Sequence, residues 1–90
     1  MSKFERLCSK VRAILSADWD PIGVRDVPEA KDEYEPYVVP VAKRLMAAIS
    51  HSNLSNYLLE IETGTMGLGG DNDRARAVAE KLRDIEIAEL

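Results

Sequence analysis

Four segments of this chain carry apolar residues at every third or fourth position, and short runs rich in proline, glycine or aspartate lie between them. This spacing gathers the apolar side chains on one face of a helix. No segment alternates apolar and polar residues as a half-buried strand does. The sequence therefore predicts an all-α fold. We expect a small bundle of about four helices in a single helical domain over residues 1–90, with an ordered acidic loop between helices 1 and 2.

The first, third and fourth predicted helices have clear patterns and boundary residues. In the first helix the apolar face consists of Phe4, Leu7, Cys8, Val11, Ile14 and Leu15. The third is predicted over Ser52 to Thr63, with Ser52 as its N-cap and Gly64 as a left-handed stop. The fourth is expected to follow an N-cap at Asp71, and Arg76 and Glu80 are spaced for an ion pair.

The second predicted helix contains two prolines, Pro36 and Pro40, within apolar residues of helical spacing. Proline fits a first helical turn but removes a hydrogen bond inside a helix. The helix therefore starts either near Glu33, with Pro36 in the first turn and a kink at Pro40, or only near Pro40. We favour the first alternative, because it places acidic residues at the positive end of the helix.

The stretch between the first two helices, "DWDPIGVRDVPEAKDEY" over residues 18–34, is the most unusual part of the sequence. Its turn-forming residues predict a structural corner, in which an aspartate caps the turn, Gly23 takes a positive φ angle, and Trp19 or Ile22 closes the end of the bundle. The residues of the predicted corner are Trp19, Pro21, Ile22 and Gly23.

The net charge of −4 is concentrated in the same stretch. Residues 17–35 contain seven acids against Arg25 and Lys31, a net of −5, so the rest of the chain sums to +1. An acidic surface of this kind attracts basic partners by steering and complementarity. The candidate partner-binding residues are Asp26, Glu29, Asp32, Glu33 and Glu35.

A calcium loop is an alternative interpretation of residues 18–29. Counted from Asp18, acids occupy positions 1, 3, 9 and 12 of a twelve-residue EF-hand loop, and Gly23 falls at position 6. The candidate ligands are Asp18, Asp20, Asp26 and Glu29. Ile22 at an oxygen-ligand position, Arg25 at an apolar position and two prolines in the loop count against this alternative.

No pattern in the sequence identifies a reaction, so we expect a protein that is not an enzyme and holds no cofactor. His51 is the only histidine and lies beside a helix start, and Cys8 lies on an apolar face. Glu60 and Glu62 are expected to be solvated. The glycines of residues 64–70 match no phosphate-binding pattern.

Nucleic-acid binding through the first helix is a further alternative. Lys3, Arg6 and Lys10 form a basic stripe there, although the net negative charge argues against such binding. The lack of a long apolar run predicts no membrane association, and one cysteine suits a reducing, cytoplasmic location. Four short helices can leave apolar edges that a homodimer would cover.

Several short motifs resemble a group of small uncharacterised bacterial proteins that carry a W-D-P-x-G and a D-E-Y pattern, including domains of unknown function. These motifs are Asp18-Trp19-Asp20-Pro21-Ile22-Gly23-Val24, Asp32-Glu33-Tyr34 with Tyr37 and Pro40, Tyr57-Leu58 with Ile61-Glu62, and Met66-Gly67-Leu68. The resemblance covers about residues 17–68. It implies a compact helical fold and a bacterial origin, and it implies no reaction or ligand. From the residues we expect a protein-interaction module, of inhibitor, immunity or regulatory type, that uses its acidic surface.

Overall fold

The computed structural model describes residues 2–24, 26–30 and 32–90. Within these residues the chain forms four α-helices and no strand, which confirms the predicted all-α bundle. The helices are α1 (Lys3–Ile14), α2 (Glu35–Met46), α3 (His51–Glu60) and α4 (Asn72–Arg83). Short 3₁₀ turns, η2 (Pro28–Ala30) and η4 (Ile87–Glu89), lie in the acidic loop and near the C-terminus.

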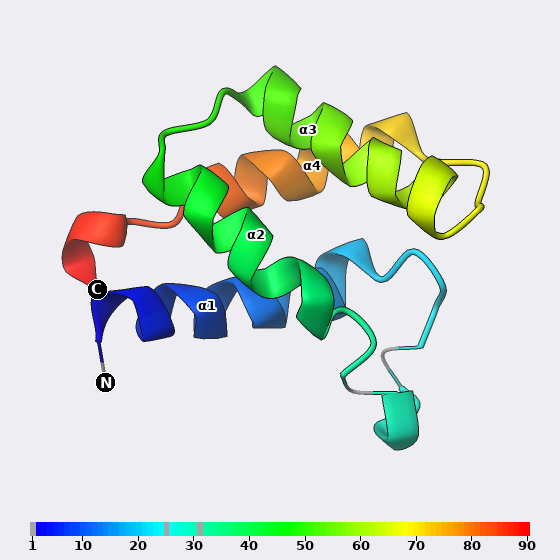
Figure 1. Ribbon diagram of the computed structural model, residues 1–90, viewed down its shortest axis with the longest axis horizontal. Coiled ribbons are helices and arrows are strands. Elements are labelled where there is room, and N and C mark those ends of the chain that lie inside the picture. Colours follow the sequence, from blue (N-terminus) through cyan, green and yellow to red (C-terminus); the bar gives the residue numbers. More distant parts are fainter. Residues whose placement is uncertain (1, 25, 31) are drawn as a thin grey trace.

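The helices pack in two pairs around one core (Figure 1). α3 and α4 form an antiparallel pair, α2 crosses α1, and α1 also contacts α4. The molecule is flattened, with extents of 35 × 31 × 18 Å. The fully buried side chains of the core come from every helix and include Leu7, Val11, Leu15, Val41, Leu54, Leu58 and Leu82.

The helix starts follow from side chains that bind free backbone N–H groups. Ser2 and Glu5 form a reciprocal capping box at α1. α3 is capped by Ser50, whose hydroxyl accepts from the Asn53 amide at 3.1 Å. The prediction of Ser52 as the N-cap is therefore wrong by two residues, because extended backbone at Ser50 already starts the helix at His51.

α4 begins as the sequence predicts, directly after Asp71. The Asp71 carboxylate accepts from the Arg74 amide at 3.0 Å. The predicted ion pair between Arg76 and Glu80 does not form, and both side chains are exposed. Solvation by water thus replaces a contact that would stabilise an exposed helix only slightly.

The start of α2 decides between the two starting points, near Glu33 or near Pro40, that the sequence left open. It begins at Glu35, with Pro36 in the first turn and Pro40 inside the helix. The Arg44 guanidinium donates to the Pro40 carbonyl at 3.1 Å and stacks over the Tyr57 ring at 3.8 Å from its centroid. This stacking joins α2 to α3 by a cation–π contact.

Two helices end in a wider π turn. α1 continues into η1 (Leu15–Trp19), and α3 continues into η3 (Ile61–Thr65). Gly64 lies inside η3, so the prediction of a left-handed stop at Gly64 is wrong; the positive φ falls instead at Gly67, at +67°. The extra residue of each π turn re-aims the side chains that follow it.

Candidate functional site

Trp19 closes the end of the bundle, as the corner interpretation expected. Its side chain is 1 % exposed. Its ring centroid lies 5.4 Å from that of Tyr34 and 5.9 Å from that of Tyr37, the second pair in edge-to-face geometry. These aromatic contacts fix α2 against the end of α1 through the corner.

A hydrogen-bond network around Asp20 holds the corner in shape. The Asp20 carboxylate accepts from the Val24 amide at 2.8 Å and from the Tyr34 hydroxyl at 2.7 Å. The Tyr34 oxygen in turn accepts from the Ile22 amide at 3.2 Å. Burial and the bond to Asp20 raise the pKa of the Tyr34 phenol well above its ordinary value of 10. Tyr34 thus ties the start of α2 to the turn after α1.

The backbone of the corner is unusual at two positions. Gly23 has a φ of +67°, as predicted, and its amide donates to the Asp20 carbonyl at 3.1 Å. Asp20 itself has a φ of +35°, a conformation that a non-glycine residue seldom adopts. Pro21 lies in the turn between them. Ile22 is 39 % exposed and does not close the bundle, so Trp19 alone fills that role.

A buried carboxylate, Glu62, connects this corner to the other half of the molecule. Its side chain is completely buried. One Glu62 oxygen accepts from the Trp19 indole Nε1 at 3.2 Å, and the other accepts from the Arg74 guanidinium. The expectation of a solvated Glu62 is wrong, because this residue lies on the same buried face as Leu54 and Leu58. The two π turns therefore meet at the Trp19–Glu62 hydrogen bond.

Arg74 reaches Glu62 from α4 and is itself only 31 % exposed at its side chain. Its Nε is buried and has no hydrogen-bond partner among the described residues. A buried carboxylate needs such a cation, since an uncompensated charge inside a protein is strongly unfavourable. We therefore assign Trp19, Glu62 and Arg74 a structural role as a clamp between α1, α3 and α4.

Two of the acids near the corner are neutralised within the chain. The Arg12 guanidinium donates to both Glu35 oxygens, at 2.7 and 2.8 Å. This bond lowers the pKa of Glu35 and raises that of Arg12. Lys81 pairs with Asp18 at 2.9 Å. Glu35, a candidate partner-binding residue, is thus already occupied by an internal cation.

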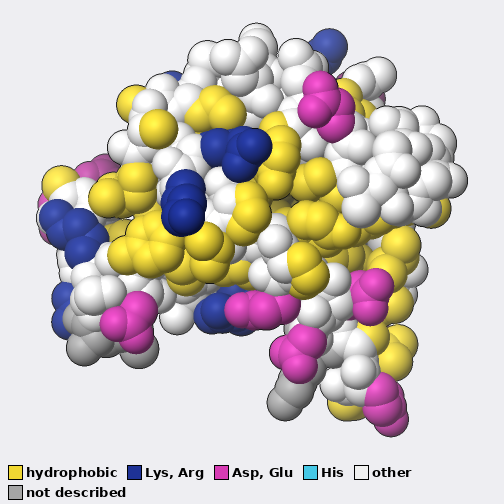
Figure 2. Space-filling view, in the orientation of Figure 1, with side chains coloured by type: hydrophobic (Ala, Val, Ile, Leu, Met, Phe, Trp, Pro, Cys, Tyr) yellow, Lys and Arg dark blue, Asp and Glu magenta, His cyan; other side chains and the backbone are white. Residues whose placement is uncertain are grey.

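The remaining four candidate partner-binding residues, Asp26, Glu29, Asp32 and Glu33, lie together on one projecting segment. We call its described residues, 22–24, 26–30 and 32–33, the acidic lobe. All four side chains are exposed and make no hydrogen bond or ion pair among the described residues. Two large apolar side chains of the lobe, Ile22 and Val27, are 39 % and 42 % exposed. Figure 2 shows magenta carboxylates around yellow side chains on the projection at the lower right.

The calcium candidates are not arranged as a cation site. Asp18 is paired with Lys81, and Asp20 binds a backbone amide and the Tyr34 hydroxyl. Asp26 and Glu29 belong to the lobe. In the part of the chain that the structure describes, no three acidic, histidine or cysteine side chains come together as a metal site would need.

The other candidate residues of the sequence are buried, bonded within the chain or simply exposed. Cys8 is 7 % exposed, and burial raises its pKa, which disfavours the reactive thiolate. The His51 Nε2 lies 2.9 Å from the Arg76 carbonyl, a link between α3 and α4. Of the basic stripe on α1, Lys3 and Lys10 are exposed, whereas Arg6 donates to the Leu90 carbonyl.

A signal for the buried Glu62 was present in the sequence. Glu62 follows Leu58 by four residues, and Leu58 follows Leu54 by four, so helical periodicity already places Glu62 on the buried face. A buried tryptophan also requires an acceptor for its indole N–H. Arg74 carried no comparable signal, because a cation in a first helical turn is ordinarily solvated.

No helix among the described residues has the length and apolarity that crossing a membrane requires. No protein-family model, no curated protein and no solved structure matches this chain. The function is therefore argued from the geometry and chemistry of the chain itself.

Proposed function

We propose that this chain is a non-enzymatic protein-interaction module, and that the acidic lobe is the surface that contacts its partner. The observation that carries the proposal is that four exposed carboxylates, which make no ion pair among the described residues, share one projecting segment with two exposed apolar side chains. Carboxylates provide steering and specificity, while apolar side chains provide the desolvated centre that an interface needs.

The frame beneath the lobe supports this role. Tyr34, Asp20 and Trp19 hold both ends of the segment through hydrogen bonds and ring contacts. A surface that is already ordered loses less conformational entropy when it binds. By contrast, Glu35 and Asp18 are used in ion pairs within the chain, so a partner would meet the lobe rather than the whole acidic stretch.

The chemistry of the lobe indicates a basic protein partner. Its four free carboxylates favour a surface rich in lysine and arginine, and association with such a surface is faster at low ionic strength. An inhibitor, immunity-type or regulatory protein would use such a surface to cover a basic site on its target. The size of the exposed apolar area suits a small contact centre surrounded by charge.

The test compares two triple variants of the full chain. In the first, Asp26, Asp32 and Glu33 of the lobe are each changed to lysine. In the second, Glu60, Asp73 and Glu80, which are exposed on α3 and α4, are changed to lysine. Both variants change the net charge equally. Proteins captured from the native cell lysate are identified by mass spectrometry, and each is then purified and titrated against the three chains.

We expect a partner that binds the parent and the α3–α4 variant but is lost by the lobe variant. Its affinity should fall as salt increases, because the contacts are partly electrostatic. A partner that binds all three chains equally, or that is lost equally by both variants, would contradict the proposal. Circular dichroism of each variant verifies that the helices remain formed.

A further inference from the structure

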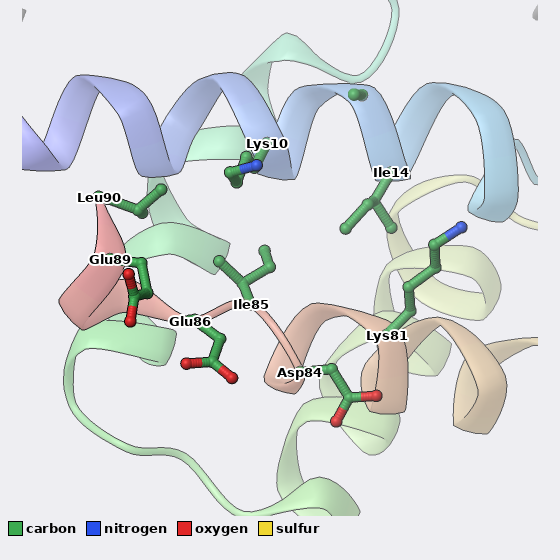
Figure 3. Close-up of a pocket in the computed structure, with 9 residues that line it drawn as sticks. Lys10, Ile14, Lys81, Asp84, Ile85, Glu86, Glu89 and Leu90 are labelled. Carbon is green, nitrogen blue, oxygen red and sulfur yellow. The ribbon is translucent and has the colours of Figure 1, made fainter.

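A groove runs between α1 and the C-terminal part of the chain, away from the acidic lobe. Its volume is about 580 Å³, which falls in the range of ordinary binding pockets. α1 forms one wall, and the end of α4 with η4 forms the other (Figure 3). Neither the corner nor the clamp described above contributes to it.

The floor of this groove is apolar. Ile14 points into it from α1, Ile85 points up toward α1 from the segment after α4, and Leu90 closes one end (Figure 3). All three side chains are only partly buried, so they remain available to a ligand. Ala13 leaves additional space beside them, since it presents only a methyl group.

The rim of the groove is negatively charged. Asp84, Glu86 and Glu89 are exposed, and their carboxylates make no ion pair among the described residues. On the cationic side, Lys81 is neutralised by Asp18 at 2.9 Å, which leaves the Lys10 ammonium. Three carboxylates and one ammonium give the free rim a net charge of −2.

We propose that this groove binds a basic amphipathic segment of another protein. Apolar side chains of that segment would occupy the floor beside Ile14 and Ile85. Its lysines or arginines would lie against Glu86, Glu89 and Asp84. The combination follows the helix-in-groove mode of recognition, in which an apolar face is buried and flanking charges set the partner. This site is separate from the acidic lobe and does not depend on the function proposed for it.

The probe is a short fluorescein-labelled helical peptide with leucines along one face and lysines on the other. Its dissociation constant is measured by fluorescence anisotropy at near-physiological salt. Ala13→Phe fills the groove from an exposed helix position and should raise that constant about tenfold, the effect of losing one buried side chain. Ala77→Phe, at an exposed position of α4 outside the groove, is the matched control and should leave binding unchanged.

Charge variants test the rim. The pair Glu86→Lys and Glu89→Lys should weaken binding, whereas Glu60→Lys with Glu80→Lys makes the same charge change away from the groove and should have a much smaller effect. Lys10→Glu should tighten binding, because it removes the free cation of the rim. A gain of affinity cannot be produced by a variant that fails to fold.

Amide chemical shifts in NMR locate the peptide on the parent chain. Shifts that gather at Ala13, Ile14, Ile85 and Leu90 are expected. Shifts confined to the acidic lobe, equal binding by Ala13→Phe and Ala77→Phe, or no response at millimolar peptide would each overturn the groove proposal. The lobe variant of the preceding section should still bind the peptide in the groove, so failure of one proposal is distinguishable from failure of the other.

Discussion

At the residue scale, Tyr34 joins the two ends of the acidic segment through one phenol oxygen. That oxygen donates to Asp20 and accepts from the Ile22 amide. Tyr37 lies one turn along α2 and also contacts Trp19, but its hydroxyl makes no hydrogen bond among the described residues. The same substitution to phenylalanine at both tyrosines therefore distinguishes the contribution of the hydroxyl hydrogen bonds from that of the ring contacts.

We expect Tyr34→Phe to lower the free energy of unfolding by about 1 to 3 kcal/mol at neutral pH, because a part-buried amide loses its acceptor and a carboxylate loses a donor. Tyr37→Phe should change it by less than about 0.5 kcal/mol. Urea denaturation followed by circular dichroism measures both. Equal losses in the two variants would contradict the role assigned to the Tyr34 hydroxyl.

The same hydroxyl predicts that the stability of the folded chain depends on pH in the alkaline range. The pKa of Tyr34 is raised in the folded chain, so its contribution to stability is complete below about pH 10 and is lost as the pH rises above that value toward the folded pKa. Urea midpoints measured from pH 8 upward should therefore fall more steeply above pH 10 in the parent than in Tyr34→Phe. Parallel curves would show that the phenol is not linked to folding.

At the element scale, the clamp of Trp19, Glu62 and Arg74 joins the end of α1 to the consecutive pair α3 and α4. Arg74→Ala leaves the fully buried Glu62 carboxylate without its cation. Removing one partner of a buried ion pair lowers the free energy of unfolding by about 3 to 5 kcal/mol. For Arg74→Ala we expect a loss at the lower end of this range, because Arg74 is partly exposed.

The double variant Glu62→Gln with Arg74→Ala provides the control, because it removes the buried charge together with its partner. It should be more stable than Arg74→Ala alone, and the single variant Glu62→Gln completes the double-mutant cycle that measures the coupling. Chemical denaturation followed by Trp19 fluorescence is the measurement. If Arg74→Ala matches the parent, the guanidinium does not stabilise the carboxylate.

The elements also show what the sequence could predict. Apolar periodicity predicted all four helices, and local chemistry predicted the starts of α2 and α4 from Pro36 and Asp71. The π turns were not predicted, because apolar periodicity and capping residues do not distinguish a π turn from an α-helical one; the two turns meet at the hydrogen bond between Trp19 and Glu62. Gly64 was predicted to end the third helix, because glycine often stops a helix. In the structure the helical turn continues through it.

For the candidate site, the corner residues Trp19, Pro21 and Gly23 were predictable because tight turns have specific backbone requirements. Which of the acids form ion pairs within the chain could not be predicted. Glu35 and Asp18 are neutralised by Arg12 and Lys81, which lie 23 and 63 residues away in the chain. Such pairings depend on how the helices pack and leave no trace in a short stretch of sequence.

At the scale of the whole molecule, few large apolar side chains are exposed, and they belong to two different segments of the chain. Among the described residues, the large apolar side chains classed as exposed are Ile22 and Val27 on the lobe and Val39 and Met46 on α2. A stable interface buries about 800 Å² from each partner, over about 20 to 30 residues. With so few large apolar side chains exposed, we expect a single copy rather than the homodimer that the sequence left open.

Small-angle X-ray scattering tests this expectation. The Cα radius of gyration is 12.5 Å, and a compact chain of this length is expected to give about 12 Å. A homodimer of the same compactness would give about 16 Å. A value near 16 Å that falls on dilution would show self-association and would contradict this expectation.

The Trp19–Glu62 hydrogen bond spans 43 residues of sequence, and this separation governs the timing of its formation. Closing so long a loop is entropically unfavourable, so contacts within the helices and the α3–α4 hairpin precede it during folding. Interactions made after the folding barrier slow escape from the native state more than they speed its formation. We therefore expect loss of the clamp to speed unfolding more than it slows folding, which would shorten the time for which the corner holds the acidic lobe in shape.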